Sequence, residues 1–390
     1  MTITTGQGLD RVRELYRDRT LRARELKSEG KTLLGYFDMY PVLEMVTALD
    51  LVPFQILGDI TEPVTLADSY LPNMVCPFLR SFLDLGLKGR YSFLDGITLA
   101  HSCEVGEKMS HIWNIYLNPR YSHFLDTPHT THAAAQKEFK ELLQDFRKTL
   151  EAFTGLDLSP ERLRRAIELH NEERRLVREL YDLRKPDPPL VSGSETIQVL
   201  AAITSLPVAE ANELLRQVIA EARQRRDGPP PKSARLLLWG SIIDNTALTD
   251  MIESLDASVV MDDENMGSRS FFPMVEATPD PLDGLAHRYL VGLKTPRIFP
   301  TPPVRDGKKD YAGDLENRFG YLKEYARDWQ VNGVVMQVLR YCDVQAYEVP
   351  SLRDYLDSLD IPNLFIEHDY SQAAMAPLKT RVQAFLEIIA

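Results

Sequence analysis

The sequence is poor in cysteine: it has three in 390 residues, Cys76, Cys103 and Cys342. A small and odd number of cysteines argues against a disulfide-stabilised secreted fold. No CxxC pair is present, although such close pairs are typical of zinc sites and of ferredoxin-type clusters. Each thiol, taken alone, is therefore expected to be a small buried side chain without chemistry of its own.

Other features are missing as well. No apolar run reaches the roughly 20 residues that a membrane span requires, and Met1–Arg24 lacks the apolar core of a secretory signal. The formal net charge of −12 argues against nucleic acids and anionic membranes as partners. The chain has no glycine-rich nucleotide-binding motif and no Ser-His-Asp arrangement. These absences predict a cytoplasmic protein that does not itself bind a nucleotide.

What is present is an alternation of apolar and amphipathic segments. Short apolar runs alternate with helical patterns in residues 35–132 and again in 233–390, which predicts two parallel sheets. Residues 133–232 read as a helical segment with a linker, and residues 1–34 as an N-terminal segment with one helix, Leu9–Gly30. The predicted fold class is α/β, with two doubly wound parallel-sheet domains of Rossmann or flavodoxin type.

The three cysteines occupy related positions in this pattern. Cys103 follows the predicted strand Gly96–Ala100, Cys342 follows Gly333–Leu339, and Cys76 stands at the start of a predicted helix. Ligands of α/β proteins bind at the carboxyl ends of strands, and a helix N-terminus favours a thiolate. If the two sheets face each other, the three thiols can meet, and such a set suits a soft metal centre. Spacing alone leaves three packing thiols as the alternative.

Several segments carry a resemblance to a known family. In chain order they are Gly58-Asp59, Cys76-Pro77, Phe93–Ile97, Cys103-Glu104, Trp239–Ser241, Asp262-Asp263, Leu315–Trp329, Gly333–Val335, Tyr341–Asp343, Pro350–Leu352, Ile361-Pro362, Glu367–Tyr370, Thr380-Arg381 and Ala384–Glu387. They extend over nearly the whole chain and include all three cysteines. On these segments the sequence resembles the benzoyl-CoA reductase / 2-hydroxyacyl-CoA dehydratase family, of the 2-hydroxyglutaryl-CoA dehydratase D-component type.

The resemblance implies that Cys76, Cys103 and Cys342 hold a 4Fe-4S cluster in which one iron has no cysteine ligand. It also implies a heterodimer with a paralogous cluster-bearing subunit, and an acyl-CoA substrate at or near the subunit interface. A separate ATP-hydrolysing iron–sulfur activator would inject single electrons of low potential, so that ATP acts only through that activator. In the dehydratases the electron produces a ketyl radical from a 2-hydroxyacyl-CoA, and in the reductases electrons enter an aromatic ring.

Two departures from the family pattern concern the choice between these branches. The usual Cys-Asp is Cys103-Glu104 here, and Glu107-Lys108 replaces a basic pair. The aromatic and histidine-rich stretch Trp113–His132 resembles the smaller subunit of class I benzoyl-CoA reductases, although core aromatics on a helix and a loop explain it equally well. The leading hypothesis is an electron-transferring reductase subunit. The alternatives are the small subunit of a dehydratase, a non-enzymatic homologue that holds a cluster, and a metal-free protein.

Polar residues near the cysteines are candidates for proton transfer. His101 is predicted to donate a proton or to form a supporting hydrogen bond near the cluster. Glu104 is predicted to carry a proton, because a carboxyl group buried beside a cluster holds its proton more tightly. His368 is a weaker candidate of the same kind. The ordinary alternatives are a structural histidine and a solvated carboxylate.

Three further charged residues follow predicted strands. Asp262 and Asp263 are expected either to face the cleft between the sheets or to cap the next turn. Arg340 is expected to bind a CoA phosphate, to offset the charge of the cluster or, more simply, to form a surface ion pair.

Overall fold

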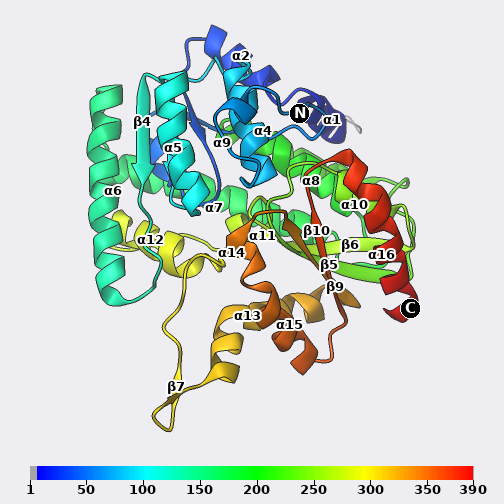
Figure 1. Ribbon diagram of the computed structural model, residues 1–390. Helices are drawn as coiled ribbons and strands as arrows, with labels where there is room; N and C mark the ends of the chain where they lie inside the picture. The colour runs from blue at the N-terminus through cyan, green and yellow to red at the C-terminus, as the bar shows by residue number, and fades with distance from the viewer. Residues whose placement is uncertain (1–6, 390) are drawn as a thin grey trace.

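The computed structural model describes residues 7–389, which fold around two four-stranded sheets (Figure 1). The first sheet contains β1 (Leu33–Tyr36), β2 (Val52–Gln55), β3 (Gly96–Ala100) and β4 (Tyr121–Leu125). The second contains β5 (Ala234–Gly240), β6 (Ala257–Asp263), β9 (Gly333–Leu339) and β10 (Asn363–His368). All pairings within these two sheets are parallel, so the predicted α/β class with two parallel sheets is confirmed.

The two sheets have the same topology. Their strand orders are β2-β1-β3-β4 and β10-β9-β5-β6. In each sheet the order of the strands reverses between the two central strands. In the first sheet this is the flavodoxin-like order 2-1-3-4, in which the direction of winding reverses between the first and the third strand. The second sheet, numbered within its half, runs 4-3-1-2, which is the same kind of doubly wound order with the reversal between its first and third strands. The reversals leave a crevice at the carboxyl ends of β1 and β3 in one sheet, and of β5 and β9 in the other.

Burial along the strands follows from their places in the sheets. Every residue of β5, β6 and β9 is buried, as expected for parallel strands that helices cover on both faces. The edge strands β4 and β10 have several partly exposed residues. The remaining pair, β7 (Val304–Arg305) and β8 (Lys308–Lys309), forms a small antiparallel hairpin outside both sheets.

Helices fill the connections. The first half contains α1 (Gln7–Arg17), α2 (Leu21–Ser28), α3 (Leu43–Ala48), α4 (Pro77–Leu87), α5 (Glu104–Leu117), α6 (Ala133–Thr154), α7 (Pro160–Asp182), α8 (Gly193–Ile203) and α9 (Val208–Gln224). The second contains α10 (Ala247–Glu253), α11 (Ser268–Phe271), α12 (Pro281–His287), α13 (Tyr311–Asp328), α14 (Asp343–Ala346), α15 (Val349–Ser358) and α16 (Met375–Ile389), with single turns at Ala67–Ser69, Arg288–Gly292 and Gln372–Ala374. Within residues 7–389, no helix combines the length and the apolar character that crossing a membrane requires.

The helical stretch in the middle of the chain joins the two halves. Helix α6 packs against β4 of the first sheet, α7 packs against α3 and α9, and α8 packs against β6 of the second sheet. One hydrophobic core extends from Leu33 and Phe54 in the first sheet to Leu236 and Val335 in the second. The predicted domain limits (1–34, 35–132, 133–232 and 233–390) stay predictions.

Most expected elements lie where the sequence placed them, but two regions differ. The single N-terminal helix expected over Leu9–Gly30 is two helices, α1 and α2. The Asp18 carboxylate accepts hydrogen bonds from the backbone N–H of Thr20 (3.1 Å) and from its hydroxyl (2.9 Å), and this local turn competes with helix continuation. The aromatic stretch after Cys103 forms α5 and then β4, a strand that the sequence pattern did not separate.

Gly240 provides a test of how closely β5 and β9 approach each other. Its φ of +148° is unfavourable for residues with a side chain, and a Cβ added there would lie 1.7 Å from the backbone oxygen of Gln337. We expect Gly240→Ala to lower the free energy of unfolding by roughly 2–4 kcal/mol. The measurement is the midpoint of urea-induced unfolding followed by circular dichroism.

Gly30→Ala is the matched control, because Gly30 has a φ of +80° and nothing within 4 Å of an added Cβ. It should cost only about 1 kcal/mol, the conformational term alone. Equal losses in the two variants would contradict the close approach at Gly240.

Candidate metal centre between the two sheets

Two cysteines occupy equivalent positions in the two halves. Cys103 follows β3 and is the N-cap residue of α5, and Cys342 follows β9 and is the N-cap residue of α14. Strands β3 and β9 are the third strands of their halves, so both thiols lie at the crevice where strand order reverses. The predicted position of these two cysteines after buried strands is confirmed.

Cys76 is also an N-cap residue, at the start of α4, with Pro77 as the first helical residue. Proline suits this position because the N–H it lacks would have no helical partner. At Cys103 the backbone N–H of Gly106 donates to Sγ over 3.3 Å. All three thiols therefore stand at the positive ends of backbone dipoles, which favour a thiolate.

The electrostatics indicate that the three thiols lie near one another. Burial raises the pKa of Cys76, and the thiolates of Cys342 and Cys103 raise it further. Burial also raises the pKa of Cys103 to about 11, opposed by hydrogen bonding from Gly106, and the Cys342 thiolate adds to the rise. Residues far apart in the sequence thus bring three partly buried thiols within electrostatic reach of one another, at the junction of the two sheets.

The spacing of the sulfur atoms bears on which group they fit. The three Sγ atoms do not all lie within 4.8 Å of one another. A single zinc ion with Zn–S bonds of about 2.3 Å would need sulfur atoms roughly 3.8 Å apart. Three thiolates that are not gathered around a single point fit a polynuclear iron–sulfur cluster better than a mononuclear ion.

Asp38 lies beside this pocket, and the sequence analysis missed it. It follows β1, has a φ of 66°, and is buried. Its Oδ1 accepts a hydrogen bond of 2.9 Å from the Asn265 side chain, which connects the first half to the loop after β6. Burial raises the pKa of Asp38, and its carboxylate in turn raises the pKa of Cys103 and Cys342. Only the position after the first strand of its half could have indicated it.

Ser241, which follows β5, supports Cys342. Burial raises the pKa of Cys342, and a hydrogen bond with the Ser241 hydroxyl opposes that rise. The same hydroxyl oxygen accepts from the backbone N–H of Leu339 over 3.1 Å, so its position is fixed by the adjacent strand. Gln337 extends the network, since its Nε2 donates to the Ser241 carbonyl and to Glu264.

The structure places His101 and Glu104 together at the surface side of Cys103. The imidazole Nδ1 of His101 lies 2.7 Å from the Asp126 carboxylate, and its Nε2 lies 3.4 Å from Glu104. His101 is buried, whereas the Glu104 side chain is 79% exposed. Burial therefore gives no support to Glu104 as a proton carrier, and the roles of both residues stay predictions.

The other charged candidates have structural partners. The Asp262 carboxylate accepts from the Tyr181 hydroxyl and from the backbone N–H of Ser268, so it caps the turn that follows β6. Asp263 forms a buried ion pair of 2.8 Å with Arg269.

The remaining two candidates, Arg340 and His368, lie at the carboxyl ends of β9 and β10. Arg340 lies at the surface and pairs with Glu367 over 3.3 Å, the simplest of its expected roles. His368 Nε2 lies 3.0 Å from the Gln337 side-chain oxygen inside the second half.

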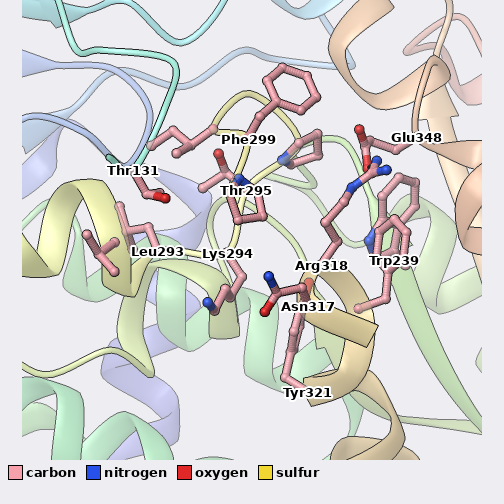
Figure 2. Close-up of a pocket in the computed structure, with 15 residues that line it drawn as sticks. Thr131, Trp239, Leu293, Lys294, Thr295, Phe299, Asn317, Arg318, Tyr321 and Glu348 are labelled. Atoms are coloured by element: carbon pink, nitrogen blue, oxygen red, sulfur yellow. The ribbon is translucent and has the colours of Figure 1, made fainter. Parts of the chain in front are cut away.

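Two hollows lie apart from the cysteines. Figure 2 shows one between the segment that carries Lys294 and Phe299 and the helix α13, with Trp239 of β5 on one wall. A larger neighbouring cavity of about 560 Å³ shares Lys294 and Tyr321 with it, and its size is that of a small-molecule site. Among the described residues that line these two hollows there is no cysteine.

Comparison with known proteins gives a consistent result. Residues 39–389 match the family described as 2-hydroxyglutaryl-CoA dehydratase, D-component. The chain is 26% identical to a benzoyl-CoA reductase subunit of Thauera aromatica, over 99% of both chains. It is 24% identical to the (R)-phenyllactyl-CoA dehydratase beta subunit of Clostridium sporogenes, over 94% of both. It is 23% identical to the beta subunit of (R)-2-hydroxyglutaryl-CoA dehydratase from Acidaminococcus fermentans, over 93% of both.

His368 makes the stability of the second half pH-dependent. Burial lowers the pKa of His368 to about 4, against an ordinary value near 6.5. As the pH falls from 6.5 to 4, the unfolded chain takes up the proton and the folded chain does not, so stability is lost in that window. We expect His368→Gln to lose less stability than the wild type between pH 7 and pH 5, measured by urea unfolding.

The exposed His287 offers the control. His287→Gln should keep the wild-type dependence on pH, and a His368→Gln variant that also keeps it would show that the imidazole is not held neutral.

Proposed function

The chain belongs to the family of the 2-hydroxyglutaryl-CoA dehydratase D-component, and on this premise we propose that it is the iron–sulfur subunit of an acyl-CoA-converting complex. Cys76, Cys103 and Cys342 would hold the 4Fe-4S cluster. The observation that supports this proposal is that three helix N-cap thiols, drawn from both doubly wound halves, lie close enough to interact electrostatically. A bound cluster supplies one-electron transfer at low potential.

The chain's own residues would hold this group. The three thiols are partly buried, and hydrogen bonds from the Gly106 N–H and the Ser241 hydroxyl reach two of the sulfur atoms. The Asp38 carboxylate places negative charge beside the pocket. Hydrogen bonds to sulfur raise a cluster's reduction potential, whereas nearby negative charge and burial lower it. The balance of these effects would set the potential.

The substrate branch that we favour is an ATP-dependent benzoyl-CoA reductase, in which this subunit passes electrons for reduction of an aromatic acyl-CoA. The benzoyl-CoA reductase relative, which matches along 99% of both chains, supports this branch. The small subunit of a 2-hydroxyacyl-CoA dehydratase is the second candidate, supported by the two dehydratase relatives. Either activity would need a paralogous subunit, an ATP-hydrolysing iron–sulfur activator and an acyl-CoA, in the cytoplasm.

Turnover by the assembled complex separates the candidates. An aromatic acyl-CoA consumed with electron uptake indicates the reductase, and loss of water from a 2-hydroxyacyl-CoA indicates the dehydratase. A cluster-bearing protein that supports neither reaction with its partner and activator would be an electron-transfer homologue.

Replacing a ligand tests the cluster itself. Anoxically purified wild-type protein should contain about four iron atoms and a matching amount of acid-labile sulfide per chain, as a 4Fe-4S cluster requires. Cys342→Ser should lose the cluster or convert it to a form with a changed EPR spectrum, because a hydroxyl is a poor iron ligand at neutral pH. Protein that folds but contains no iron after anoxic reconstitution would overturn the proposal and leave three packing thiols.

Ser241→Ala is the matched control, since it removes a hydrogen bond to Cys342 and leaves every thiol in place. It should keep the full iron content and lower the reduction potential. A hydrogen bond worth about 0.5–1.5 kcal/mol corresponds to roughly 20–65 mV for one electron. Potentiometric titration followed by EPR measures the shift, and an unchanged potential would show that this hydroxyl does not act on the cluster.

A further inference from the structure

We propose that the first turns of α5 hold a divalent transition-metal ion, distinct from the thiol centre, with His101, Glu104 and Glu107 as ligands. One ligand atom from each of these residues lies within 4.8 Å of the others. The two glutamates are three residues apart on one face of α5, and His101 reaches them from the end of β3. One imidazole and two carboxylates form a donor set that divalent ions such as Zn²⁺, Co²⁺ and Mn²⁺ accept.

The orientation of His101 is the observation that points to an ion. Its Nδ1 lies 2.7 Å from the Asp126 carboxylate, which only accepts hydrogen bonds, so Nδ1 carries the hydrogen. Nε2 faces the Glu104 carboxylate 3.4 Å away, a separation that leaves space for an ion between the two atoms. His101 is only 9% exposed, and its Nε2 is buried without a hydrogen-bond partner. A cation between Nε2 and the Glu104 carboxylate would provide a partner for both atoms.

Asp126 completes an arrangement that is common around metals. A histidine ligand usually donates its second N–H to a carboxylate, which fixes the tautomer and makes the other nitrogen a stronger donor. The Asp126 side chain is 67% exposed, and so is free to hold the imidazole from the solvent side. Because Glu104 is exposed as well, water can fill the remaining coordination positions.

The charged groups around His101, Glu104 and Glu107 are compatible with a bound cation. The Lys108 ammonium bonds Glu107 over 3.0 Å, and the His111 ring lies 4.0 Å from the same carboxylate. The His129 ring packs edge-on against His101, and its Nε2 lies 3.0 Å from the Arg297 guanidinium. The three carboxylates at the site thus face one lysine directly, and Arg297 lies behind a histidine.

An ion here would stabilise the loop between β3 and α5, which carries Cys103. His101 directly follows β3, and Glu104 and Glu107 lie in the first turn of α5. Cys103, the N-cap residue of α5, lies between them. The ion would link both sides and fix that loop. It also excludes the predicted proton transfer by His101, because a coordinated Nε2 cannot carry a proton.

The experiment uses the full-length, iron-loaded protein under anoxic conditions. Wild-type protein, Glu104→Gln, Glu107→Gln and the control Glu138→Gln are each dialysed against micromolar Zn²⁺, and bound zinc, iron and sulfide are determined in the same samples. Glu138 is an exposed acid on α6, away from the site. We expect one zinc per chain in the wild type and the control, with affinity at least tenfold weaker in the two site variants.

A second measurement guards against effects on folding. A 100-fold excess of Zn²⁺ over its dissociation constant should raise the unfolding temperature of the wild type and of Glu138→Gln, but not of the site variants. Equal zinc in all four proteins, no zinc in the wild type, or zinc gained only as iron is lost would each overturn the proposal. Because zinc is counted separately from iron, an iron-free protein would refute the cluster without deciding this site.

Discussion

The Asp244 carboxylate is the interaction on which the arrangement of the two sheets depends. It lies in the loop after β5 and is fully buried, and it accepts from the Gly58 N–H over 2.9 Å and from the Tyr370 hydroxyl over 2.8 Å. Arg19 approaches it to 3.7 Å. Gly58 follows β2 of the first sheet, Tyr370 follows β10 of the second, and Arg19 lies between the N-terminal helices. One carboxylate thus holds three parts of the chain together, and a buried charge that loses a partner costs about 3–5 kcal/mol.

That contact requires a close approach of the two halves. A Cβ on Gly58 would lie 2.5 Å from the Tyr370 hydroxyl oxygen, so a larger residue there would separate the sheets or displace the tyrosine. With the sheets held at this separation, their carboxyl-terminal crevices face each other. Asp38 and Cys103 from one half then share a pocket with Cys342 from the other. The thiol centre is a consequence of how the halves are joined, and neither half could form it alone.

The parts of this arrangement that the sequence could predict are those set by local pattern. The apolar runs Gly96–Ala100 and Gly333–Leu339 predict strands with the bounds that the structure shows, and a cysteine shortly after each follows directly. Pro77 in the same way marks the start of α4. Asp38, Ser241 and their contacts could not be predicted, because nothing near them in the sequence distinguishes an acid or a serine that lines a pocket from one in a solvated loop. Their roles come from strand order, which brings β1 beside β3 and β5 beside β9.

The same topology also explains why the thiols divide two to one between the halves. In the first half, the connection from β2 to β3 carries Cys76 at the start of α4. In the second half, the corresponding connection from β6 to β9 begins after Asp263, which pairs with the fully buried Arg269. Arg269 also donates to the Gly240 carbonyl and to Asn265, the residue that bonds Asp38. At this connection the first half has a second thiol, whereas the second half has an ion-pair network. That network holds Asn265, the donor of the hydrogen bond to Asp38, in place, so the half with fewer thiols positions a residue beside the thiols of the other half.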